Sequence, residues 1–509
     1  MTRGPLGLFR ELVERLVPGG GLRERTIKSG IWVMLRNVAD RGMQLVMLVV
    51  LARLLDPEDF GLLGIALLSI AVLRRLSKLG LDTALIQNED ENVDAYMNTV
   101  WLIQIVRGVV ICVVGFVSAP YVASFFDAPM VADVLRVLAF SPLLRSFRNP
   151  YIVYLKKDLD LHVEFVHRIS ATFGKVVVGI VLAVILGNVW ALVAANLVGN
   201  ALLAALSYPL ARSRPSLGFD RALAVDLFQY GKWMTGASIF GFLFSQGDDA
   251  FLGWFLGATA LGYYQLSYQI ARAPATEITS VISTTMLSSY SKMQGDRRSL
   301  RQTYFKAIAV STTVSAPMAV GIAVVASDFV VVFLGEEWLS TVALMQVLAA
   351  WGYLLSIGSP SGPLLQAIGR PDYTAKATFV KTALLAVLIY PFTAAYGVVG
   401  TAVAVVASAA LTSEPYVVWN VLREIDGSVR ELAWQVGVPT AAALVMGASV
   451  MAAKYAFLGT PSLLGFVALV LVGVTSYVLT LLLFDRVFGF GISDLFVQLA
   501  RTGVGSSTA

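Results

Sequence analysis

The chain is divided into long runs of about twenty residues that contain few charges and follow one another from Ser29 to Phe484. A helix needs about twenty apolar residues to cross the hydrocarbon core of a bilayer, whereas a spanning β-strand needs only about ten. With 57% hydrophobic residues, the chain also has too little polar surface for a soluble globule of this length. We therefore predict an all-α polytopic membrane protein with about fourteen transmembrane helices, at 29–53, 61–80, 98–118, 129–152, 164–186, 189–210, 232–255, 262–288, 305–327, 339–367, 375–394, 397–420, 433–453 and 462–484.

Basic residues are concentrated in alternate loops, which predicts the orientation of the helices, because short cytoplasmic loops retain Lys and Arg. The cytoplasmic loops would be those that carry Lys156 and Lys157, Arg212 to Arg221, Lys292 to Arg298, Arg370, and Arg423 to Arg430. Both termini would then be cytoplasmic, in a multi-pass protein of the cell (inner or plasma) membrane. The net charge of +5 follows from this asymmetry and gives no indication of nucleic-acid binding.

An internal repeat divides the chain. An offset of 201 residues superposes Gly30 on Gly231, Leu51 on Leu252, Leu55 on Leu256 and Gly61 on Gly262. Two similar six-helix halves are typical of transporters, with the substrate bound between them. The predicted divisions are a cytoplasmic amphipathic segment (1–28, for which a solvated helical tail is the alternative), a first six-helix bundle (29–213), a cytoplasmic linker (214–231), a second six-helix bundle (232–424), and two further helices with a cytoplasmic tail (425–509).

Charged residues within the apolar runs indicate where a substrate would bind. A central Arg or Lys costs about 2.5 to 3.5 kcal/mol on insertion scales, so several of them cannot face lipid unpaired. Bases near the helix ends, such as Arg74 and Arg107, can extend to the interface, and Arg36 can pair with Asp40 four residues later. A hydrated cationic cavity for phosphate or pyrophosphate would accommodate the others. The candidate anion-binding residues are Arg36, Arg41, Arg145, Arg148, Lys175 and Arg272.

Acids in the same runs are candidates for coupling transport to a proton or sodium gradient, because carboxylates in membranes can titrate in proton relays. They are Asp40, Asp248, Asp249, Glu277 and Glu414. Neither a metal nor a cofactor is expected, since Cys112 is the only cysteine and the two histidines lack metal-ligand spacing. No phosphate-binding loop for ATP occurs either.

Three segments carry a family resemblance: Leu51 to Leu63, Leu79 to Gln87, and Asp248 to Tyr264. They resemble the polysaccharide and lipopolysaccharide (O-antigen-type) flippases of the multidrug/oligosaccharidyl-lipid/polysaccharide exporter superfamily. Arg214 to Asp220 is similar to the linker between the two halves in that family. The resemblance implies a V-shaped, fourteen-helix fold. It also implies that Arg36, Arg41 and Arg272 lie on helices that line the cationic cavity.

The same resemblance implies alternating access that carries a polyprenyl-(pyro)phosphate-linked oligosaccharide from the cytoplasmic to the outer leaflet, for cell-surface polysaccharide or glycan assembly. Expected partners are this glycan lipid, membrane lipids and glycan-assembly proteins, and an undecaprenyl or a dolichyl carrier is compatible with the sequence. The chain would be a transporter and not an enzyme, because its short outer loops leave little room for a catalytic site. An ion-coupled small-molecule or drug exporter of the same superfamily is the alternative, although an acid-dominated cavity would suit it better.

Overall fold

The computed structural model describes residues 22–77, 93–157, 160–457 and 461–489, and all regular structure in these ranges is helical. The described chain forms two compact units, Met1–Gly262 and Tyr263–Ala509. The seventh predicted helix thus lies in the first unit, and the predicted domain boundaries at 214–231 stay a prediction. Helices of the first unit are α2 (Leu22–Leu54), α3 (Pro57–Leu76), α5 (Val93–Phe125), α6 (Met130–Leu138), α7 (Phe140–Ser146), η1 (Pro150–Val153), α8 (Tyr154–Lys157), α9 (Leu161–Leu186), α10 (Val189–Ala205), α11 (Ser207–Leu210) and the first part of α12 (Arg221–Lys292).

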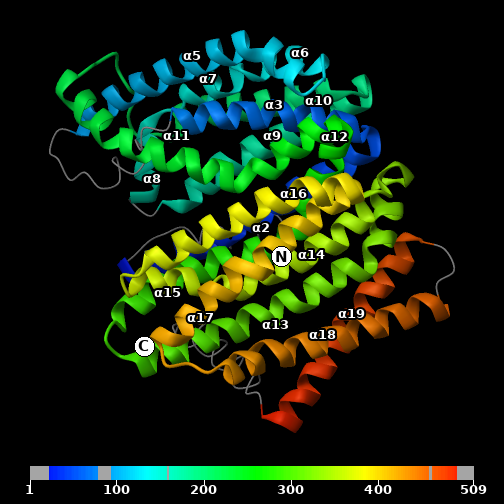
Figure 1. Ribbon diagram of the computed structural model, residues 1–509. Helices are drawn as coiled ribbons and strands as arrows, with labels where there is room; N and C mark the ends of the chain where they lie inside the picture. The colour runs from blue at the N-terminus through cyan, green and yellow to red at the C-terminus, as the bar shows by residue number, and fades with distance from the viewer. Residues whose placement is uncertain (1–21, 78–92, 158–159, 458–460, 490–509) are drawn as a thin grey trace, which may run out of the picture. The chain divides into compact units, whose positions relative to one another are not determined.

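The second unit continues from α12 and is also helical throughout its described part (Figure 1). Its helices are α13 (Arg297–Phe329), η2 (Val330–Leu334), η3 (Glu336–Trp338), α14 (Thr341–Gly358), α15 (Ser361–Ala367), α16 (Pro371–Ser408), η4 (Ala409–Ser413), α17 (Glu414–Glu424), α18 (Val429–Phe457) and α19 (Leu463–Phe488). Helix α13 packs on α14 and α18, and α18 packs on α19. Apolar side chains such as Met446, Leu469 and Leu481 fill the space between these helices.

Each predicted helix range lies mostly on helix, and 78–80 lies outside the described residues. Two ranges predicted as single helices are instead broken near prolines. The range 129–152 divides into α6, α7 and η1, and 339–367 divides into α14 and α15. Pro142 and Pro363 each lack the N–H that would donate to a carbonyl four residues earlier, so the helix is interrupted just before each of them.

Eight stretches of the described chain are long and apolar enough to cross a membrane. Helix α2 is not among them, because Arg36, Asp40 and Arg41 interrupt its apolar residues. A multi-pass membrane protein is thereby confirmed, and the count of fourteen crossings stays a prediction. The charges within α2 are explained by the packing of the first unit.

Tight turns between helices use glycine. Gly187 ends α9 with φ +59°, and Gly397 turns the chain within α16 with φ +58°. Gly257 makes the equivalent turn within α12 with φ +84°. Positive φ is a region that glycine enters without the steric cost that a Cβ adds, so each of these positions can interrupt the helical path. The side chain of Asn188 then caps α10 by accepting a hydrogen bond from the N–H of Trp190 (3.2 Å).

Helix α3 and the turn of α12 are joined by two equivalent backbone contacts. A Cβ on Gly61 would lie 1.8 Å from the carbonyl oxygen of Ala258, and a Cβ on Gly262 would lie 1.9 Å from the carbonyl oxygen of Pro57. The offset of 201 residues that relates Gly61 to Gly262 also relates Pro57 to Ala258. The internal repeat seen in the sequence is therefore present as a reciprocal backbone contact within the first unit.

Candidate functional site: a basic pocket in the first unit

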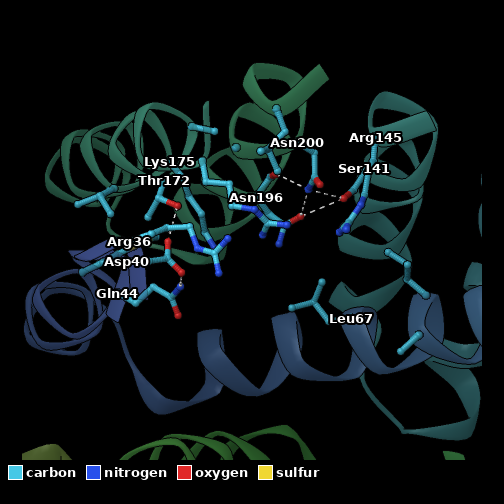
Figure 2. A pocket seen from close by; sticks show the side chains of 18 of the residues that line it. Arg36, Asp40, Gln44, Leu67, Ser141, Arg145, Thr172, Lys175, Asn196 and Asn200 are labelled. Carbon is cyan, nitrogen blue, oxygen red and sulfur yellow. Dashed lines mark hydrogen bonds between the residues drawn. The ribbon is translucent and has the colours of Figure 1, made fainter. Parts of the chain in front are cut away.

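A cavity of about 400 Å³ lies among α2, α3, α7, α9 and α10 of the first unit (Figure 2). Its polar lining comes as stripes with helical spacing, since side chains three, four or seven residues apart share one face of a helix. Helix α2 contributes Arg36, Asp40 and Gln44; α9 contributes Arg168, Thr172 and Lys175; α10 contributes Asn196 and Asn200; α7 contributes Ser141 and Arg145; and α3 contributes Leu67 and Arg74.

Positive charge dominates this pocket. Five basic side chains line it, Arg36, Arg74, Arg145, Arg168 and Lys175, whereas Asp40 is the one acid among its described lining residues. Arg145, Arg107 and Arg75 lie within electrostatic range of Arg74, and each repels its charge. Such an arrangement is costly unless water or an anion occupies the space between the guanidinium groups.

One buried acid behind the pocket orients two of the arginines. Glu164, on α9, is 3% exposed and pairs with Arg36 Nη1 at 3.2 Å and with Arg168 Nε at 3.0 Å. Arg36 also donates to the side-chain oxygen of Asn37, at 3.1 Å from Nη2. Because Glu164 neutralises only one of these two charges, the described residues of the pocket keep an excess of three formal positive charges even when Glu164 is included.

Asp40 has other partners than the sequence predicts. The predicted ion pair between Arg36 and Asp40 is wrong, because Arg36 pairs with Glu164 on the neighbouring helix instead. Gln44 Nε2 donates to Asp40 Oδ2 at 2.7 Å, and Thr172 Oγ1 donates to Asp40 Oδ1 at 2.7 Å (Figure 2). Asp40 therefore ties α2 to α9 through neutral groups. An i,i+4 spacing permits an ion pair but does not choose it over a partner from another helix.

The position of Lys175 depends on a glycine. A Cβ on Gly199 of α10 would lie 3.2 Å from the Cβ of Lys175 and 3.3 Å from its Cδ. The Lys175 side chain thus crosses α10 where no side chain obstructs it. A hydrogen bond between His167 Nε2 and the carbonyl oxygen of Leu203 (2.9 Å) holds α9 and α10 at this spacing. His167 is fully buried, so its ring also packs between the two helices.

Neutral hydrogen-bonding groups form the wall opposite α2. Asn200 Nδ2 donates to Ser141 Oγ at 2.9 Å and to Asn196 Oδ1 at 3.1 Å, and Ser141 Oγ donates to Asn196 Oδ1 at 3.0 Å. Figure 2 shows these three side chains beside Arg145, which lies one helical turn from Ser141 on α7. The pocket thus combines a cationic wall with an amide and hydroxyl wall.

Comparison with known proteins assigns the chain to a family. The profile described as "Polysaccharide biosynthesis protein" matches residues 50–343, which is more than half of the chain. The chain belongs to this polysaccharide biosynthesis family. The lipopolysaccharide biosynthesis protein WzxC of Escherichia coli K12 is 29% identical over 369 residues, which cover 71% of this chain and 74% of that protein.

Solved structures show which fold this chain shares. The lipid II flippase MurJ, in an inward closed conformation, superposes with a TM-score of 0.71 at 14% identity over 89% of this chain and 99% of its own. An inward-facing multidrug resistance transporter of the MATE family gives a TM-score of 0.58 at 16% identity over 77% of this chain and 94% of its own. These likenesses confirm the predicted fold class, an all-α polytopic membrane protein.

Four residues predicted from the sequence meet in this pocket: Arg36, Arg145 and Lys175 as bases, and Asp40 as an acid. The others lie elsewhere. Arg41 is exposed on α2, Arg148 lies in the turn after α7, and Asp248 and Asp249 are half-buried in α12, all outside the pocket lining. Arg272 is exposed in the second unit, with its guanidinium 5.7 Å from the ring centre of Tyr268. The side chain of Glu277 lies outside the described residues.

Sequence reasoning missed several residues of the pocket. It assigned Arg74 to the membrane interface and did not single out Arg168, Thr172, Asn196 or Asn200. A signal was present, because Arg168, Thr172 and Lys175 follow one face of a helix, and so do Asn196 and Asn200. In a hydropathy profile these residues only interrupt an apolar run, whereas their helical spacing places them in one polar stripe.

Proposed function

We propose that this protein is a flippase that carries a polyprenyl-(pyro)phosphate-linked oligosaccharide from the cytoplasmic to the outer leaflet by alternating access, for the assembly of a cell-surface polysaccharide or glycan. The chain is a transporter and not an enzyme in this proposal. The observation that carries it is the pocket with five bases and one acid among apolar helices. Family membership and the names of WzxC and MurJ support the same direction.

The chemistry of a glycan lipid matches this pocket. A phosphate or diphosphate accepts two parallel hydrogen bonds from one guanidinium, so an arginine both neutralises and orients it. A glycan headgroup would bring many unsatisfied hydroxyls into hydrocarbon, at several kcal/mol each by transfer estimates, whereas a hydrated polar pocket removes most of that cost. Arg36, Arg145 and Lys175 would bind the diphosphate, together with Arg74 and Arg168. The apolar carrier chain would stay in the lipid.

A second candidate is an ion-coupled exporter of small molecules, which the superposition on a multidrug resistance transporter favours. That likeness concerns the fold. A cationic drug would be repelled by the excess of bases in the pocket, so the flippase is the better-supported function. In either case Asp40, Asp248, Asp249 and Glu277 are proposed as acids that could couple transport to an ion gradient.

Purified protein in liposomes tests the proposal. The probe is a decaprenyl-diphosphate disaccharide with a fluorescent label on its sugar, and dithionite quenches the label only in the outer leaflet. The variants are Lys175→Met and Arg145→Gln. Arg41→Ala is the matched control, because Arg41 lies on α2 next to Asp40 but outside the pocket lining. Ethidium efflux is measured from the same vesicles.

We expect wild-type protein and Arg41→Ala to exchange the probe between leaflets, and each pocket variant to lose about tenfold or more of that rate, which corresponds to about 1.4 kcal/mol of lost interaction. If Arg41→Ala lost as much activity as Lys175→Met, this pocket would not be the binding site. If wild type left the probe in place and extruded ethidium, the exporter would replace the flippase.

The proposed location is the inner or plasma membrane, with both termini in the cytoplasm. Reporter fusions at the two ends test this topology, since cytoplasmic alkaline phosphatase is inactive and cytoplasmic green fluorescent protein is fluorescent. Glycan-assembly proteins are proposed as partners because the flipped lipid must be consumed on the outer side. Crosslinking in membranes that contain the glycan polymerase would test that contact.

A further inference from the structure

The pocket of the first unit has two walls of different chemistry, and the second wall is not needed to bind phosphate. Arginine and lysine side chains would suffice for a diphosphate. Asn196, Asn200 and Ser141 carry no charge, yet they line the same cavity (Figure 2). We propose that Asn196 and Asn200, held in place by Ser141, form a subsite that recognises the hydroxyl or acetamido groups of the sugar attached to the diphosphate. This inference rests on the proposed function.

Hydrogen bonding within the cluster leaves two polar groups for a ligand. Asn200 Nδ2 donates to Ser141 Oγ, to Asn196 Oδ1 and to the Asn196 carbonyl, and Ser141 Oγ donates to Asn196 Oδ1. Asn196 Nδ2 and Asn200 Oδ1 make no hydrogen bond to any part of the protein that the structure describes, and neither is a buried unpaired atom. They therefore present one donor and one acceptor to the cavity.

A donor beside an acceptor suits a sugar. A hydroxyl group both donates and accepts, and so does an acetamido group, whereas a phosphate oxygen without a proton can only accept. Because Ser141 and Asn196 fix the orientation of the Asn200 amide, the subsite is arranged before the ligand enters. Sites that are built to hydrogen-bond a hydroxyl discriminate strongly against analogues without it, since their polar groups would be left unpaired.

The position of the cluster places the sugar next to the anion. Arg145 follows Ser141 by one helical turn on α7, so a cation and the amide cluster share one end of the pocket. The cavity volume of about 400 Å³ is near the lower end of the range of about 300 to 1,000 Å³ that encloses a drug-sized ligand. It suits a diphosphate with one sugar, and it is small for a whole oligosaccharide. Further sugars would then lie outside this subsite.

Soluble short-chain probes test the inference with purified protein in detergent. Dissociation constants are measured for farnesyl diphosphate and for farnesyl diphosphates that carry glucose, galactose or N-acetylglucosamine. The variant is Asn196→Ala combined with Asn200→Ala, and Ser141→Ala is measured separately as a milder change that leaves both amides. Asn420→Ala is the matched control, since it removes an amide from a helix of the second unit, where Asn420 Nδ2 donates to the carbonyl of Tyr416 at 2.8 Å.

We expect wild type to bind at least one sugar-bearing probe about tenfold more tightly than farnesyl diphosphate. The double variant should lose this preference while its affinity for farnesyl diphosphate changes less than about twofold, Ser141→Ala should weaken the preference, and Asn420→Ala should keep it. Equal affinity of wild type for all probes would overturn the inference while leaving an anion site. So would a double variant that kept the preference, or one that lost farnesyl diphosphate as well. Wild type that bound none of the probes would overturn the proposed function itself.

Discussion

The reciprocal glycine contact between α3 and the turn of α12 gives a stability prediction that can be worked from the structure. We consider Gly61→Ala and Gly262→Ala. The new Cβ would lie 1.8 Å from the carbonyl oxygen of Ala258 in the first case and 1.9 Å from that of Pro57 in the second. Since real Cβ atoms keep at least 3.0 Å from other heavy atoms, the two backbones must separate by about 1 Å.

Two features set the size of the effect. Overpacking costs about 1 to 3 kcal/mol when side chains can adjust, and here both groups in collision are backbone, so we expect about 3 kcal/mol. Gly30→Ala and Gly42→Ala are the controls, because a Cβ at either position of α2 meets nothing within 4 Å. These controls should stabilise the helix by up to about 1 kcal/mol, the difference in helix propensity between alanine and glycine.

Thermal unfolding of the detergent-purified protein measures the difference. For a domain of about 150 to 250 residues, 1 kcal/mol shifts Tm by about 2 to 4 °C, so each test variant should unfold about 6 to 12 °C below wild type. The combined variant should lose less than the sum of the two, because one separation of the backbones relieves both collisions. A Tm within about 2 °C of wild type for either test variant would refute the reasoning, as would a control that fell as far.

Three further substitutions test the pocket and the turns. Glu164→Gln should destabilise the protein by about 3 kcal/mol, the low end for a broken buried ion pair, because Arg168 is partly exposed. Asp133→Asn, in an exposed pair with Arg136, should change stability by less than about 1 kcal/mol. Denaturation in detergent distinguishes the two variants, and equal losses would contradict the assigned role of Glu164. Gly397→Ala should cost about 1 to 3 kcal/mol because alanine is strained at φ +58° and ψ −141°, whereas Gly362→Ala, with open space around it, should be neutral or stabilising; a neutral Gly397→Ala in the same assay would contradict the turn. Gly199→Ala should displace the flexible Lys175 side chain by a few tenths of an ångström, so farnesyl diphosphate binding should weaken while Tm stays close to that of wild type; unchanged binding would argue against a role for Lys175 in anion binding.

The membrane nature of this protein, its helical class and its internal repeat could be predicted from the sequence. Apolar run length reports directly on bilayer thickness, so the helix ranges agree with the structure to within a few residues at most ends. The 201-residue offset relates Gly61 to Gly262, but only the structure shows that the two glycines lie at reciprocal backbone contacts, where a Cβ would collide. Breaks at Pro142 and Pro363 were missed, because hydropathy does not register a lost backbone donor.

Only some residues of the site could be predicted from the sequence. Charge content identified Arg36, Arg145, Lys175 and Asp40, since a charge in an apolar run is costly enough to require an explanation. Tertiary packing decided which charges meet. Arg36 forms its ion pair with Glu164 and not with Asp40, and Arg41, beside Asp40 in sequence, lies outside the pocket lining. Neighbours along a helix point in different directions, and an ion pair forms with whichever opposite charge the packing brings within about 4 Å. The sequence fixes the faces of single helices, whereas only their packing determines which faces enclose the same cavity.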